Sequence, residues 1–111
     1  EKLENAKEAF NVAQWSDSIY HSYSAFINTA KALLTSIGAK TNTQAGIVNS
    51  FDEQFVATKK IVLSTKFSEL VYQINKEKPS EAFAKKYLSE AKAFYKAVDI
   101  YRKKEVSYAE S

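Results

Sequence analysis

The sequence contains no cysteine, and among its 111 residues there are only two glycines and one proline. Without cysteine, the chain has no disulfide, no thiolate ligand for zinc or an iron-sulfur cluster, and no cysteine nucleophile. So few glycines and prolines leave few points at which a helix would break, and long helices are expected. Gly38 and Gly46 are isolated from each other, which excludes a glycine-rich loop that binds phosphate.

Arginine is almost absent as well. The chain has 16 basic and 13 acidic residues, a net charge of +3, and Arg102 is its only arginine. Nucleic-acid sites rely on arginine, whose planar guanidinium forms paired hydrogen bonds with phosphates and base edges. A nucleic-acid partner is therefore not expected. No apolar run approaches the roughly 18 residues of a membrane span, so no membrane partner is expected either.

What the sequence does contain is helical periodicity. Apolar residues recur at spacings of three and four along most of the chain, which is typical of helices that bury one face. The connections between these segments are short, and short connections favour antiparallel neighbours. The sequence thus predicts an all-α fold, an up-and-down antiparallel bundle of four to five helices forming a single domain over residues 1–111. The expected helices cover residues 2–14, 17–37, 41–57, 61–76 and 81–104.

Several helix ends carry local signals. Gly38 is expected to end the second helix, because glycine adopts the left-handed conformation that closes a final turn. Thr41 and Gln44 fit a capping box at the start of the third helix. The sequence Lys78-Pro79-Ser80-Glu81 is typical of a helix start, and residues 107–111 are expected to fray. Residues 61–63, Ile-Val-Leu, also suit a strand, but an isolated strand would leave its backbone unpaired, so a helix is expected there.

The candidate ligand-binding residues are Asp17, Tyr20 and His21, in the first turns of the second expected helix. Asp17 and His21 are four residues apart and can meet on one helix face, where they form either a general base or a structural pair. Aromatic residues around His21 favour core packing over stacking on a ligand ring. A single histidine predicts no metal site, and the serines near it lie on no strained turn that would present a nucleophile. No catalytic residue and no metal ligand are therefore assigned.

Residues 15–34, WSDSIYHSYSAFINTAKALL, resemble the HEPN family, the higher eukaryote and prokaryote nucleotide-binding domains. Residues 3–102 follow the family's order of helices: a first helix, a short turn, a tyrosine-bearing helix that ends in AKALL and a glycine, and a helix capped near a threonine. Many members are ribonucleases that use an Arg-x4-6-His motif across a dimer groove. This chain lacks the motif, because residues 73–80 contain neither arginine nor histidine and no histidine follows Arg102.

The resemblance therefore implies a non-catalytic accessory domain with no cofactor of its own. It implies a homodimer, or docking to a covalently linked enzyme domain, in the cytoplasm. Residues 1–27 also resemble helical tails of bacterial sulfite or nitrite reductases, so the parent enzyme is expected to be of that kind. The chain begins at Glu1 without an initiator Met, as expected for a fragment. The alternatives are a nucleotide or small-anion binding module near His21 and a degenerate ribonuclease of the toxin-antitoxin type.

Overall fold

Helices make up nearly all of the regular structure in the computed structural model, which describes the backbone of residues 2–110 and the side chains of residues 2–104. No strand occurs in this part of the chain, as the sequence predicts. The helices are α1 (Lys2–Asn11), α2 (Trp15–Ser36), α3 (Gln44–Phe51), α4 (Phe67–Val71) and α5 (Glu81–Glu110). A π-helical turn, η1 (Asp52–Val56), extends α3, and a 3-10 turn, η2 (Tyr72–Asn75), extends α4.

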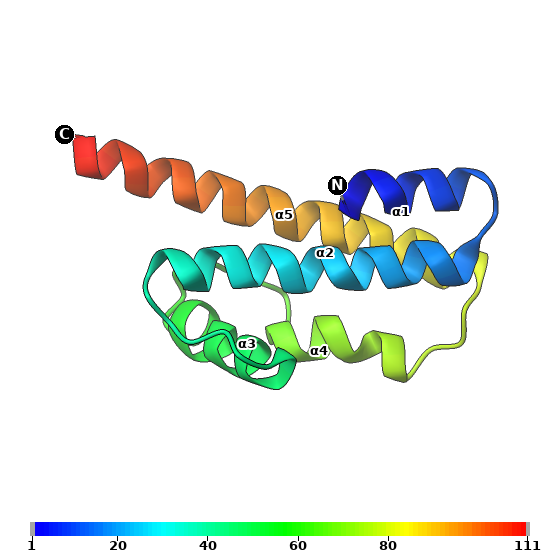
Figure 1. The fold of residues 1–111 in the computed structure, drawn as a ribbon, viewed down its shortest axis with the longest axis horizontal. Helices are drawn as coiled ribbons and strands as arrows, with labels where there is room; N and C mark the ends of the chain where they lie inside the picture. Colours follow the sequence, from blue (N-terminus) through cyan, green and yellow to red (C-terminus); the bar gives the residue numbers. More distant parts are fainter. Residues whose placement is uncertain (1, 111) are drawn as a thin grey trace.

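The four helices other than α3 alternate in direction, as expected for an up-and-down bundle (Figure 1). Helices α2 and α5 run side by side and in the same direction, with α1 and α4 running opposite to them. Helix α3 lies at the C-terminal end of α2, where it also contacts α4. Helix α1 covers only one end of the α2 and α5 pair, so part of that pair has no helix over it (Figure 1).

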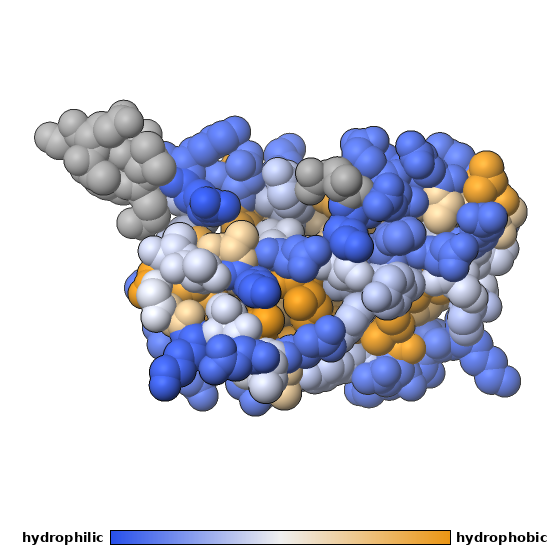
Figure 2. Space-filling view, viewed as in Figure 1, coloured by the Kyte–Doolittle hydropathy of each residue, from blue (hydrophilic) through white to orange (hydrophobic). Residues whose placement is uncertain are grey.

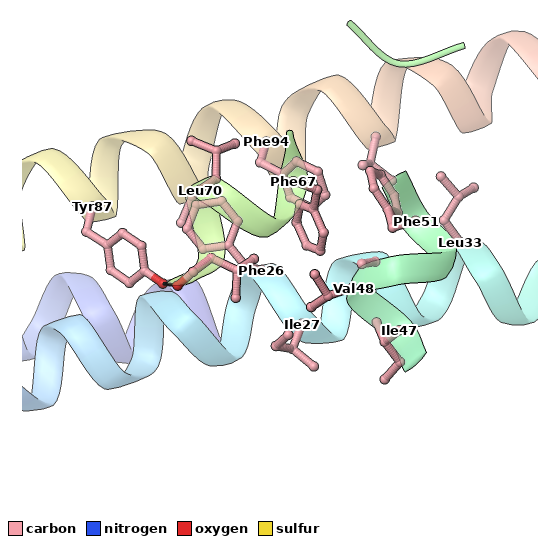
Figure 3. Close-up of a cluster of buried hydrophobic side chains, with 14 of the residues drawn as sticks. Phe26, Ile27, Leu33, Ile47, Val48, Phe51, Phe67, Leu70, Tyr87 and Phe94 are labelled. Carbon is pink, nitrogen blue, oxygen red and sulfur yellow. Dashed lines mark hydrogen bonds between the residues drawn. The ribbon is translucent and has the colours of Figure 1, made fainter. Parts of the chain in front are cut away.

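Phenylalanines from four different helices meet at the centre of the core: Phe26 of α2, Phe51 of α3, Phe67 of α4 and Phe94 of α5 (Figure 3). The rings of Phe67 and Phe94 stack with centroids 4.8 Å apart, and Phe51 lies 4.6 Å from Phe67 and 5.2 Å from Phe94. Phe26 lies 5.5 Å from Phe94. All four residues are fully or almost fully buried. Other buried apolar residues of α2, α3, α4 and α5 surround them and complete the core. We call the four phenylalanines the phenylalanine cluster.

Two polar contacts, one buried and one exposed, join the helices around this cluster. The Tyr87 hydroxyl donates to the Val71 carbonyl oxygen at 2.7 Å, and burial raises the pKa of this tyrosine, so that the hydroxyl keeps the proton it donates. The Tyr23 hydroxyl donates to Gln44 Oε1 at 2.5 Å and links α2 to the start of α3. Burial raises the pKa of Tyr23, and Tyr72 and Tyr20 raise it further. Both hydroxyls therefore act as donors at neutral pH.

Small residues let α1 and α2 approach closely. Ala6 and Ala9 of α1 are buried, as are Ser18, Ser22 and Ala25 of α2. The Ser18 hydroxyl crosses between the two helices and donates to the Ala6 carbonyl oxygen at 2.9 Å. Ser18 thus belongs to the packing between α1 and α2, and Ser22 is buried as fully as Ser18.

The turns confirm some of the predicted boundaries. Gly38 has φ +77°, and the amides of Gly38 and Ala39 donate back to the carbonyls of Thr35 and Leu34, which is the Schellman motif expected at a glycine. The same pattern of two hydrogen bonds ends α1. The Ala13 amide donates to the Phe10 carbonyl, and the Gln14 amide donates to the Ala9 carbonyl.

In the turn after α1, the left-handed residue is not a glycine. Ala13 has φ 61° and is exposed. The expected end of the first helix at residue 14 is therefore wrong, because α1 ends at Asn11. Helix α2 correspondingly begins at Trp15, earlier than the predicted residue 17.

Other predicted boundaries are wrong. Thr43, not Thr41, caps α3, with its hydroxyl accepting from the Gly46 amide at 2.9 Å. Helix α4 begins at Phe67, so residues 61–66 are not helical; instead the Ile61 amide donates to the Phe55 carbonyl at 3.0 Å. The predicted start of α5 is correct, and the Ser80 hydroxyl caps it. Its predicted end near Lys104 is wrong, because α5 continues to Glu110. Ser111, within the segment expected to fray, lies outside the described residues.

Asp52 explains why α4 begins where it does. Its carboxylate accepts from the backbone amides of Phe67 at 2.7 Å and Ser68 at 3.1 Å, which are unpaired donors at the start of α4. Lys66, which immediately precedes α4, provides no side-chain cap. Asp52, the first residue of η1, therefore performs the capping role that the local sequence lacks.

Candidate functional site

The three candidate residues lie in the first turns of α2, where α1 turns back over it. Asp17 and His21 line one side of an open hollow of about 380 Å³ between the two helices. Across from them, α1 contributes Asn5, Glu8 and Ala9, and the turn adds Val12 and Gln14. Tyr20 does not line this hollow: its side chain is 58% exposed, and its ring meets His21 edge-on, with centroids 5.9 Å apart. The structure thus brings two of the three residues together.

Asp17 and His21 share the hollow without binding each other. Among the described residues, neither an ion pair nor a hydrogen bond joins them. His21 Nδ1 is buried and has no hydrogen-bond partner. The predicted pair of Asp17 and His21 is therefore not formed. The Asp17 carboxylate makes no hydrogen bond to the imidazole ring of His21, so it does not orient that ring to act as a base.

The charge of this hollow bears on what it can bind. Glu8 and Asp17 are acidic, and no lysine lies among the lining residues. A phosphate group would be repelled by two carboxylates within a small volume, whereas a cation or a hydrogen-bond donor would be attracted. The described residues contain no group of three or more histidine, cysteine or acidic side chains that could hold a metal ion.

Catalysis at His21 would need a nucleophile within its reach. Ser18 and Ser22 are fully buried, and neither lines the hollow. The Ser18 hydroxyl is already bonded to Ala6, and the Ser22 oxygen has no partner at all. The geometry therefore assembles no serine and histidine pair in this region.

Ser22 and Ser18 form a matched pair for testing this structural role. Replacing Ser22 by Ala is expected to stabilise the fold by about 1 kcal/mol, because it removes a buried hydroxyl that makes no hydrogen bond. Replacing Ser18 by Ala is expected to destabilise it by about 1 kcal/mol, because the bond to Ala6 is lost. Urea denaturation followed by circular dichroism measures both. A destabilising Ser22→Ala would contradict the structural assignment and indicate an unseen partner for its hydroxyl.

Two further surface features were not identified as sites from the sequence. The first, which we call the α2–α5 groove, lies beyond the start of α1 and has a volume of about 180 Å³. Its lining residues are Asn28, Thr29, Ala32, Tyr95, Val98, Asp99 and Arg102. The second, which we call the lysine hollow, lies between α1 and α5 and has a volume of about 350 Å³. Sequence spacing shows which residues share a helix face, but not which two helices meet.

Within residues 2–104, the exposed large apolar side chains are those of Val12, Tyr20, Ile37, Val62, Tyr95 and Ile100. On the face shown in Figure 2, apolar patches lie along the seam between α2 and the α3 and α4 region and at the end of the molecule where α1 turns into α2, and polar residues separate them. No helix in the described part of the chain is both long enough and apolar enough to cross a membrane.

We compared the chain with known protein families, curated proteins and solved structures, and found no significant match in any of the three comparisons.

Proposed function

We propose that this domain is a non-catalytic, HEPN-like docking module that pairs with a second copy of itself through the α2–α5 groove. The observation that carries the proposal is the length of α1. With 10 residues against 22 in α2 and 30 in α5, it covers only one end of the α2 and α5 pair and leaves the groove beyond it open (Figure 1). A helix supplied from outside the fold can occupy the place that α1 does not reach.

The lining of the groove suits a protein partner. Ala32 and Thr29 are small, which lets a helix backbone come close. The Tyr95 side chain is 46% exposed, and tyrosine is enriched in protein interfaces because its ring buries well while its hydroxyl can remain hydrated. The groove thus combines small residues with an aromatic side chain that can anchor a partner.

The charges at the groove favour a second copy over other helices. Asp99 and Arg102 lie about one helical turn apart on α5 and both line the groove. In a dimer whose two-fold axis passes between them, Asp99 of each copy faces Arg102 of the other. Asp99 also pairs with Lys103 in its own helix at 3.0 Å, but both side chains are substantially exposed, so this pair is weak and leaves the carboxylate able to meet Arg102 of the other copy.

A charge-reversal series tests this pairing. Each of the single variants Asp99→Arg and Arg102→Asp is expected to weaken dimerisation by about tenfold or more, because like charges then face each other twice. The double variant restores the opposite charges and is expected to recover the affinity of the unmodified protein. Sedimentation equilibrium gives the dissociation constants, and circular dichroism confirms that each variant is folded.

Glu77→Lys is the matched control, since Glu77 is exposed and lies outside the groove. It is expected to leave the association unchanged. An unmodified protein that stays monomeric at high concentration would refute the dimer and favour the alternative occupant, a helix of a linked enzyme domain. A double variant that fails to recover would refute the proposed pairing across the two-fold axis.

A further inference from the structure

The lysine hollow collects positive charge from two helices that are far apart in the sequence. Lys7, Phe10 and Asn11 come from α1, and Lys85, Leu88, Ser89 and Lys92 come from α5. On α5 the polar members are spaced by four and three residues, so they form one edge of the helix beside its buried face. The antiparallel α1 then brings Lys7 to the same hollow (Figure 1).

No acidic residue lines the hollow. Lys7 has an ion pair with Glu4 at 3.7 Å, but both side chains are substantially exposed, so the pair holds the lysine only weakly. Within residues 2–104, no carboxylate pairs with Lys85 or Lys92. Three ammonium groups that border one hollow repel one another, and a bound anion would relieve that repulsion.

We propose that the lysine hollow binds a compact polyanion with phosphate groups joined in a chain. The separation of the lysines favours a chain over a single ion. Lys85 and Lys92 are seven residues apart on α5, a rise of about 10 Å along the helix axis. A linear anion with several charges can contact both ends, with Asn11 and Ser89 as additional hydrogen-bond donors between them.

The floor of the hollow favours a small anion over an acidic helix from a protein. Leu88 is only 6% exposed, and Phe10 is half-buried with its ring packed against Trp15 at 5.1 Å. A docking helix gains most of its affinity by burying apolar surface, and little such surface remains here. A polyphosphate depends on charge and hydrogen bonds, which the lining does provide.

Isothermal titration calorimetry with tripolyphosphate as the probe tests the proposal. The double variant Lys85→Gln, Lys92→Gln is expected to weaken binding by about tenfold or more, because each lost lysine removes a charge-assisted hydrogen bond. The double variant Lys85→Arg, Lys92→Arg keeps both charges and is expected to bind within about threefold of the unmodified protein. Circular dichroism confirms that the variants are folded.

The matched control is the double variant Lys31→Gln, Lys40→Gln, which removes the same charge from exposed positions outside the hollow. It is expected to leave the affinity nearly unchanged. Equal weakening by the control and the hollow variant would overturn the proposal, because attraction to the net charge alone would then account for binding. Absence of binding by the unmodified protein would overturn it too. Neither outcome bears on dimerisation, which is measured separately.

Discussion

Replacing Phe67 by Ala is expected to destabilise the fold by about 3 to 5 kcal/mol, the range for removing a buried phenylalanine ring. Phe67 is fully buried and contacts Phe26, Phe51 and Phe94, which come from three other helices. Its own helix, α4, has only 5 residues and could not form without these contacts. Because a domain of this size is typically stable by about 5 to 15 kcal/mol, the variant is expected to be at the edge of unfolding.

Urea denaturation at 25 °C measures this loss, with Phe67→Leu as the matched control. Leucine keeps most of the buried volume but loses the ring contacts, so its cost is expected to stay near 1.5 kcal/mol. Phe10→Ala, at a half-buried position outside the phenylalanine cluster, is expected to cost less than Phe67→Ala. A loss below about 1 kcal/mol for Phe67→Ala would show that the four helices are not held together through this ring.

The second large effect is expected at Asp52. Replacing it by Ala removes the acceptor for two amides at the start of α4 and is expected to destabilise the fold by about 2 kcal/mol. Asp52→Asn retains one neutral acceptor oxygen and is expected to lose about half as much. The unfolding free energy measures both losses, and hydrogen exchange at the Phe67 and Ser68 amides locates them.

Glu53→Ala provides the control for Asp52. Glu53 is the next residue in the chain, exposed and equally acidic, and it makes no hydrogen bond to α4. Its replacement is expected to change stability by less than about 0.5 kcal/mol. If Asp52→Ala proved as mild as this control, the carboxylate could not be what sets the start of α4.

Most of the fold could be predicted from the sequence because its signals are local. The stripes of α3 and α5 bury the residues that their periodicity indicates, among them Ile47, Phe51, Tyr87 and Phe94. Gly38 ends α2 as its conformational freedom predicts. Where signals lie within one or two helical turns, sequence spacing is a direct guide to structure.

The errors occur where the deciding contact is distant. Residues 61–66 continue a helical pattern, but the cap that determines the start of α4 is Asp52, which lies 15 residues before the amide that it binds. The chain after η1 instead passes through Lys59, with φ 60°, and Ile61, which is buried in the core while the residues on either side of it are exposed. Propensity within a short window cannot identify a cap that folding brings from another helix.

The candidate sites show the same limit. Spacing on α2 predicts that Asp17 and His21 share a helix face, and both line one hollow, but it did not indicate that Tyr20 would lie outside the hollow or that Glu8 of α1 would add a second carboxylate there. Sequence spacing likewise gave no sign that Lys85 borders a hollow with Lys7, because only the packing of α1 on α5 brings the two residues together. Family membership and the accessory role remain predictions.

The left-handed turn at Ala13 has a consequence for how much stability this sequence could still gain. An alanine in that conformation costs about 1 kcal/mol relative to glycine, and a lysine at position 59 carries a similar cost. Both side chains are exposed, so no packing compensates for the strain. The fold therefore tolerates unfavourable backbone conformations at two turns, and its amino acids are not those that would maximise its thermal resistance.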